Sequence, residues 1–216
     1  MRKLVLSIAA VAVVVSAYAS GWGVNVATSV GVLNPGGVAS NVPSTVISNP
    51  LPQVTFNTSI ATPNPILVGD GTSFTNGTFT AVYSIRDTSG TKGSLTGFNF
   101  VIGAEVQGSG RIVWFKKVVD RNTSEILYSG TGVFLGGRYQ GGQDGAINYN
   151  VFIPLSRPSN NFTVFEVFIL DIANAPAPGP DKAALLLVEQ DWVPEPASLL
   201  ALATGLGALA LRRRKK

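Results

Sequence analysis

The sequence contains no cysteine and no histidine, and charged residues make up only 13% of its 216 positions. Without thiolate or imidazole ligands, the usual zinc, copper and haem sites are excluded, and so is Ser-His-Asp or Cys-His catalysis. The fold must be held by its hydrophobic core, because no disulfide can form. We therefore expect a protein without metal or cofactor, and one that is not an enzyme.

Basic residues are scarce outside the two ends of the chain. The formal net charge is +4, but seven of the 16 Lys and Arg residues are terminal. Between residues 20 and 193, nine basic and eleven acidic residues leave a net charge of about −2. A basic surface for phosphate backbones is therefore missing, which excludes nucleic acid as a partner.

Residues 1–19 have the layout of a secretory signal peptide. Two basic residues precede a twelve-residue stretch, 4–15, that is apolar except for one serine. Ala17 and Ala19 provide the small side chains that signal cleavage requires, so we expect cleavage before Ser20. At about 1.5 Å per residue, the apolar stretch is too short to cross a bilayer core of about 30 Å. The sequence thus predicts export through the Sec translocon and removal of the signal.

The C-terminal segment, 194–216, combines three features. Pro194, Glu195 and Pro196 come first, and an uncharged apolar run of 15 residues, 197–211, follows. Proline fixes φ and donates no hydrogen bond, so the motif should end the preceding strand and leave an accessible, extended tripeptide. The run would form a transmembrane helix of about 22 Å, marginal for a span. Five basic residues then hold this end on the cytoplasmic side of the membrane: Arg212, Arg213, Arg214, Lys215 and Lys216.

This order of motif, apolar helix and basic cluster resembles the PEP-CTERM sorting signal of bacteria, a segment also known as the ice-binding-protein C-terminal domain. The resemblance covers residues 193–216. It implies recognition and cleavage by an exosortase-like enzyme of the membrane. It also implies a protein that is anchored transiently in the inner membrane, with its body outside, and then reaches the cell surface or the medium. A simple tail anchor with a chance motif is the alternative.

The exported middle of the chain divides at residue 65. Residues 20–65 are rich in Asn, Ser, Thr and Pro, which indicates an extended lead-in with one or two edge strands. Within residues 66–193, apolar and polar residues alternate with a period of two, or form short apolar runs between polar turns. This pattern predicts an all-β domain, an antiparallel β-sandwich, with a jelly-roll variant left open. The strand order cannot be read from the sequence.

Residues 130–145 include seven glycines and contain the two candidate ligand-binding residues. A nucleotide-binding loop would need a third glycine at fixed spacing and a following helix, so we interpret the segment as a surface hairpin. Tyr139 is the best candidate for an exposed ring. Asp144 is a candidate that, with backbone carbonyls, would suit Ca²⁺, although no metal motif is present.

Three functions remain open. The favoured one is a structural or adhesive protein of the cell surface or extracellular matrix. The second is a carbohydrate-binding module for the exopolysaccharide. Its stacking platform would consist of Trp114, Tyr139, Tyr149 and Trp192, although aromatic rings at alternating strand positions usually belong to a core. The third is a glycoside hydrolase, which would require two carboxyl groups, such as those of Glu105 and Glu166, to face each other across a cleft.

Overall fold

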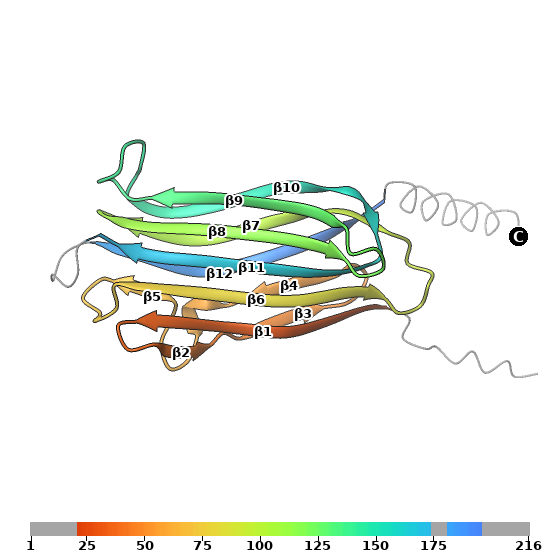
Figure 1. Cartoon of the computed structure of the whole chain (residues 1–216), viewed down its shortest axis with the longest axis horizontal. Helices are drawn as coiled ribbons and strands as arrows, with labels where there is room; N and C mark the ends of the chain where they lie inside the picture. Colours follow the sequence, from red (N-terminus) through yellow and green to blue (C-terminus); the bar gives the residue numbers. More distant parts are fainter. Residues whose placement is uncertain (1–20, 174–180, 196–216) are drawn as a thin grey trace, which may run out of the picture.

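The computed structural model describes residues 21–173 and 181–195, which form two antiparallel β-sheets packed face to face (Figure 1). The predicted antiparallel β-sandwich is therefore confirmed. The signal peptide and the C-terminal apolar run lie outside the described residues. Within those residues, no helix is long and apolar enough to cross a membrane.

The first sheet, called sheet A here, has the strand order β2-β1-β6-β11-β8-β9. Each neighbouring pair is antiparallel. The bounds of its strands are β1 Trp22–Asn34, β2 Val38–Asn41, β6 Asn76–Asp87, β8 Gly110–Asp120, β9 Ile126–Leu135 and β11 Asn161–Ile172.

The second sheet, sheet B, has the order β10-β7-β12-β4-β3, and β5 also pairs with β12. The bounds of its strands are β3 Ser44–Ile47, β4 Gln53–Phe56, β5 Leu67–Gly69, β7 Leu95–Gln107, β10 Gly145–Ser159 and β12 Lys182–Pro194. A single 3₁₀ turn, Thr58–Ile60, connects β4 to β5. Because β12 has neighbours on both sides, the last strand of the chain lies in the interior of sheet B.

The structure moves the start of the domain from residue 66 to Trp22. The predicted lead-in contributes β1 to β4, and β1 pairs with β6 from Trp22 to Asn34. Six prolines that suggested an extended segment all fall in the connections between β1 and β5, where their missing N–H groups cost nothing: Pro35, Pro43, Pro50, Pro52, Pro63 and Pro65.

The alternation in β6 places one face in the core. Phe79, Ala81, Tyr83 and Ile85 are all fully buried. The residues between them, Thr80, Val82 and Ser84, lie on the outer face and are partly exposed. The core is rich in aromatic rings: the ring of Trp192 lies 4.5 Å from that of Phe162 on the opposite sheet, centroid to centroid. Contacts of this kind between sheets A and B fix how the two sheets pack.

Both ends of the described chain lie at one end of the sandwich (Figure 1). Trp22 is opposite Asp87, and Pro194 is opposite Leu95, the first residue of β7. We call this the proximal end. The other end, the distal end, carries the glycine-rich β9–β10 loop and the β7–β8 turn (Figure 1).

Candidate functional site

The start of the sorting motif is part of the folded domain. Pro194 is the last residue of β12, is buried, and lies at a bulge opposite Leu95. The backbone N–H of Glu195 donates to the carbonyl of Ser94 at 2.9 Å. The expectation of an accessible tripeptide is therefore wrong for Pro194, since a bulge at a strand end accommodates a residue without an N–H. Pro196 lies outside the described residues.

The other predicted sorting residues also lie outside the described part of the chain. These are the signal-cleavage residues Ala17, Ala19 and Ser20, and the basic cluster 212–216. The structure therefore informs the sorting signal only through Pro194 and Glu195.

Asp144 organises the glycine-rich loop at the distal end. One oxygen of its exposed carboxylate accepts the backbone N–H groups of Gly137 and Gly108, each at 2.7 Å. These two hydrogen bonds hold the pKa of Asp144 below its ordinary value. The bonds tie the β9–β10 loop to the β7–β8 turn, which gives the carboxylate a structural role.

Tyr139 lies in the same loop and is half-buried. Its hydroxyl donates to the carbonyl of Ser109 at 3.1 Å. Next to it, Arg138 pairs with Asp181 at 2.9 Å, and Asp181 also accepts the Ser109 hydroxyl at 2.7 Å. The structure thus brings both candidate ligand-binding residues, Tyr139 and Asp144, into one loop, where their polar atoms hold the loop in place.

The two carboxylates considered for a hydrolase, those of Glu105 and Glu166, lie on opposite sides of their sheets, one facing solvent and the other facing the core. Glu105 is on the outer face of β7, where its carboxylate pairs with Lys182 at 2.8 Å. Glu166 is fully buried between the sheets. The pair therefore does not line a common cleft, as a glycosidase would require.

The proposed stacking platform is mostly part of the core. Trp114 and Trp192 are buried, with 4% and 1% of their surface exposed. Tyr149 is half-buried and packs against the rings of Trp114 and Phe134, at centroid distances of 6.0 and 5.8 Å. These rings fill the sandwich and present no flat aromatic surface to solvent.

A buried polar cluster between the sheets was missed by the sequence analysis. It consists of Tyr83 on β6, Lys116 on β8, Glu166 on β11 and Gln190 on β12, all essentially without solvent exposure. Lys116 Nζ contacts Glu166 Oε1, and Gln190 Nε2 donates to Glu166 Oε2 at 3.2 Å. The hydroxyl of Tyr83 donates to Gln190 Oε1 at 2.9 Å.

The buried surroundings of this cluster disfavour the charged forms of Lys116 and Glu166. Burial lowers the pKa of Lys116 and raises the pKa of Glu166, and their mutual attraction offsets this only in part. The sequence did contain a pattern that points to these residues. Lys116 is two residues from Trp114 and two from Val118, so it lies on the same, buried face of β8. Glu166 likewise shares its parity with buried apolar neighbours on β11.

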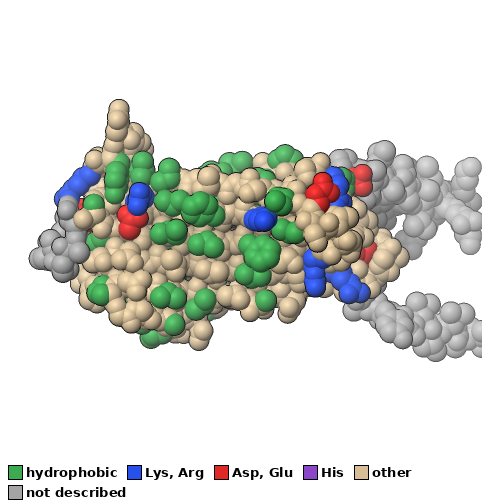
Figure 2. Space-filling model, in the orientation of Figure 1, with side chains coloured by type: hydrophobic (Ala, Val, Ile, Leu, Met, Phe, Trp, Pro, Cys, Tyr) green, Lys and Arg blue, Asp and Glu red, His purple; other side chains and the backbone are tan. Residues whose placement is uncertain are grey.

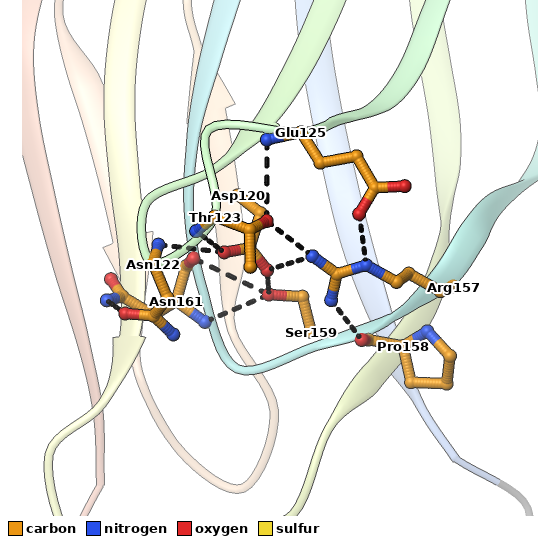
Figure 3. A network of polar contacts seen from close by, with 8 residues as sticks. All are labelled: Asp120, Asn122, Thr123, Glu125, Arg157, Pro158, Ser159 and Asn161. Carbon is orange, nitrogen blue, oxygen red and sulfur yellow. Dashed lines mark hydrogen bonds and ion pairs between the residues drawn. The ribbon is translucent and has the colours of Figure 1, made fainter.

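Asp120, the last residue of β8, is the centre of a second polar network at the proximal end (Figure 3). One carboxylate oxygen accepts the backbone N–H groups of Asn122 and Thr123 at 2.8 and 3.0 Å. The other accepts the Ser159 hydroxyl at 2.8 Å and pairs with Arg157 at 3.1 Å. Both oxygens are therefore occupied, and the network connects the β8–β9 turn to the end of β10.

This network adjoins the start of the sorting motif. Ser159 is opposite Leu95, and Leu95 is in turn opposite Pro194. Arg157 also pairs with Glu125 at 2.6 Å (Figure 3). Because the residues that fix this end of β10 also fix the start of β7, the Asp120 network supports the strand to which the motif is bound.

The outer face of sheet A carries exposed apolar side chains and few charges between its two ends (Figure 2). Phe115, Val133, Phe165 and Ile169 have between 37% and 50% of their surface exposed. They stand on β8, β9 and β11, which are adjacent in the sheet. β11 is therefore apolar on both of its faces, one of which is buried and the other partly exposed.

Comparison with known proteins identifies only the C-terminal segment. Residues 193–215 match the family model of the PEP-CTERM protein-sorting motif. No curated protein has a sequence that matches this chain.

Three solved structures resemble this chain at low similarity. The enzymatically active domain of tailspike protein 4 of bacteriophage CBA120 is 10% identical over 80% of this chain and 19% of that one, with a TM-score of 0.34. TmCBM61 in complex with β-1,4-galactotriose is 11% identical over 78% and 86%, with a TM-score of 0.32. The family 11 carbohydrate-binding module from Clostridium thermocellum, in complex with a mixed-linked tetrasaccharide, is 13% identical over 81% and 90%, with a TM-score of 0.26. At this distance, none of them indicates what this chain binds.

Proposed function

Because the chain ends in a PEP-CTERM protein-sorting motif, we propose that it is an exported structural protein of the bacterial cell surface or extracellular matrix. Its signal peptide directs it to the Sec translocon. Its tail then holds it in the inner membrane until an exosortase-like enzyme cuts near Pro194, Glu195 and Pro196. The released domain is a structural or adhesive unit.

The observation that carries this proposal is the direct continuation of β12 into the motif. β12 pairs with β7 from Lys182 to Pro194 and has β4 and β5 on its other side. A force applied at Glu195 acts along β12, whereas the hydrogen bonds to the neighbouring strands lie perpendicular to it. The force is therefore shared by all the hydrogen bonds of this interior strand at once. Such a connection suits a domain that is held at its C-terminal end until the tail is cut.

The position of the proximal end sets the orientation of the anchored domain. With Glu195 next to the membrane, the glycine-rich loop and the β7–β8 turn lie furthest from it (Figure 1). The loop residues Arg138 and Gln140 are exposed there. The distal end is thus the part of the domain that other matrix components can reach first.

A deletion strain and two assays of the processed protein distinguish the structural role from the carbohydrate-binding and hydrolase alternatives. A strain that lacks the protein should form a less cohesive matrix, and the wild-type gene should restore it. A gene with Pro194→Ala and Pro196→Ala should not, because the protein would stay unsorted. The processed protein should give a blank glycan array and should release no reducing ends from the cell's exopolysaccharide.

Two results would overturn the proposal. Saturable binding of a glycan by the processed protein, with unchanged matrix cohesion in the deletion strain, would make it a carbohydrate-binding module. Release of reducing ends from the exopolysaccharide would make it a hydrolase.

A further inference from the structure

The buried polar cluster places an amine, a carboxyl group and a carboxamide in one hydrophobic compartment. The side chains of Lys116 and Glu166 have no solvent exposure, and neither does Gln190. A buried ion pair of this kind usually costs more in desolvation than it returns in attraction. Hydrophobic residues of similar volume would often be at least as stable there. The cluster therefore needs an explanation other than stability of the ion pair.

The amine of Lys116 is poorly provided with hydrogen-bond acceptors. Among the described residues, its one hydrogen-bond partner is Glu166, although an ammonium group has three donors. Its Nζ otherwise lies over the rings of Phe98 and Phe100, at 4.7 and 4.3 Å from their centroids. Burial lowers the pKa of Lys116, which favours the neutral amine, and a neutral amine is a nucleophile.

The same amine reaches across to sheet B, where Gln190 lies. Phe100 and Gln190 are directly opposite each other on β7 and β12. Side chains in this relation have Cβ atoms about 4.5–5.5 Å apart. Lys116 Nζ, which lies over the Phe100 ring, therefore reaches the part of sheet B that carries Gln190.

Glu166 bridges the amine and the carboxamide. Its Oε1 contacts Lys116 Nζ, and its Oε2 accepts the Gln190 Nε2–H at 3.2 Å. On the other side of the carboxamide, the Tyr83 hydroxyl donates to Gln190 Oε1 at 2.9 Å. A group that touches both nitrogens can move a proton from one to the other, and a donor at the carbonyl oxygen stabilises the oxyanion that forms during attack.

We propose that Lys116 and Gln190 form an intramolecular amide bond that joins the two sheets covalently. The Lys116 Nζ lone pair attacks Cδ of Gln190, and the new C–N bond replaces the bond from Cδ to Nε2. Glu166 takes a proton from Nζ through Oε1 and delivers one to Nε2 through Oε2, so Nε2 leaves as ammonia. Primary amine and primary carboxamide become secondary amide and ammonia. No oxidant or further reactant is needed, and Glu166 ends as it began.

The link would lie where the domain carries load. It connects β8 of sheet A to β12 of sheet B, four residues before Pro194. A cross-link also lowers the entropy of the unfolded chain, as a disulfide does, in a chain that has no cysteine. Tyr83 and Glu166 would be catalytic residues in this single-turnover reaction, because both touch the reacting groups.

The direct test is the mass of the protein processed and purified from its bacterium. We expect an intact mass about 17 Da below the mass of its sequence, the loss of one ammonia. Ring closure at the Asn76–Gly77 step would give the same loss, so the position must be mapped. Digestion and fragmentation should yield one branched peptide that joins the Lys116 segment to the Gln190 segment.

Matched variants separate the reaction from folding. Lys116→Arg and Glu166→Gln should abolish the mass loss, whereas Lys117→Arg, at the exposed neighbouring position, should retain it. Gln190→Glu should give the same branched peptide with a loss of about 18 Da, because water now leaves instead of ammonia. This last variant stays informative even if the others fail to fold.

Two results would overturn the proposal. One is an unchanged mass in the folded wild-type protein, with native near-UV circular dichroism as the check of folding. The other is a branched peptide in which Lys116 is joined to Glu166, with the loss of one water.

Discussion

The side chain of Gln190 on β12 donates a hydrogen bond to the carboxylate of Glu166 on β11 at 3.2 Å, across the interface of the two sheets. The same carboxylate contacts Lys116 through its other oxygen. One buried acid thus holds together polar groups from both sheets, in a core otherwise made of aromatic and aliphatic side chains. Because an unpaired polar group is costly there, each member of the cluster depends on the others.

Tyr83→Phe removes only the hydroxyl that donates to Gln190. We expect the amide bond of Lys116 to form about a hundredfold more slowly, because the developing oxyanion loses its donor. The measurement is the mass of the protein as a function of time after the first folding of chain recovered unfolded from inclusion bodies, in which the bond has not yet formed. Unchanged kinetics would show that Tyr83 has no role in the reaction. Phe79→Leu, another buried change on β6, is the matched control and should leave the kinetics unaltered.

Asp120→Asn should destabilise the domain by about 1–3 kcal/mol at neutral pH, because a buried carboxylate with four partners loses its charge-assisted hydrogen bonds. Urea unfolding at pH 7 measures this. Glu125→Gln is the control: that side chain is 54% exposed, so breaking its pair with Arg157 should cost less than about 1 kcal/mol. Equal effects of the two changes would contradict the central position of Asp120 in the network.

The same residue predicts an acid dependence of stability. Burial alone would raise the pKa of Asp120, but hydrogen bonds from Ser159, Thr123 and Asn122, with the charge of Arg157, outweigh it and hold the pKa below the ordinary 3.8. The stability that this provides is complete above that ordinary, unfolded pKa and is lost as the pH falls from there through the lower pKa of the folded state. Unfolding free energies between pH 7 and 2 should therefore fall less steeply in Asp120→Asn than in wild type.

A flexible linker between Val193 and Pro194 should increase the fraction of processed protein in the cell. The motif is bound to the domain through the buried Pro194 and the Glu195–Ser94 hydrogen bond, so the enzyme must first release the end of β12. A Gly-Ser linker removes this requirement. The same linker after Gly90, in the β6–β7 connection, is the control and should change nothing. Immunoblots of full-length and processed protein measure the ratio, and a lower processed fraction with the first linker would contradict the prediction.

The sequence predicted the fold class because alternation and turn residues are local properties. Strands such as β6 and β10 follow from periodicity alone. The start of the domain at Trp22 could not be found this way, because β1 mixes small polar and apolar residues and prolines crowd the connections that follow it. Which strands become neighbours depends on long-range packing, and a single sequence does not record it.

The candidate sites divide in the same way, into those set by a local sequence pattern and those set by long-range packing. The sorting motif is a contiguous pattern, so the sequence analysis found it, but the binding of Pro194 to Leu95 involves residues 99 positions apart in the chain. Lys116 and Gln190 were missed because a buried lysine is rare and each residue alone is unremarkable. What could have revealed them is that each alternates in step with buried apolar residues of its own strand, and so faces the core.

The mass of the mature protein isolated from its bacterium tests the central claim most directly. We predict a chain that begins at Ser20 and ends near Glu195 or Pro196, without the apolar run and the basic cluster. The wild-type chain should be compared with a variant in which Pro194 and Pro196 are alanine, which should remain longer. A mature wild-type product that retains Lys216 would contradict sorting by cleavage at the motif, and with it the proposed route to the cell surface.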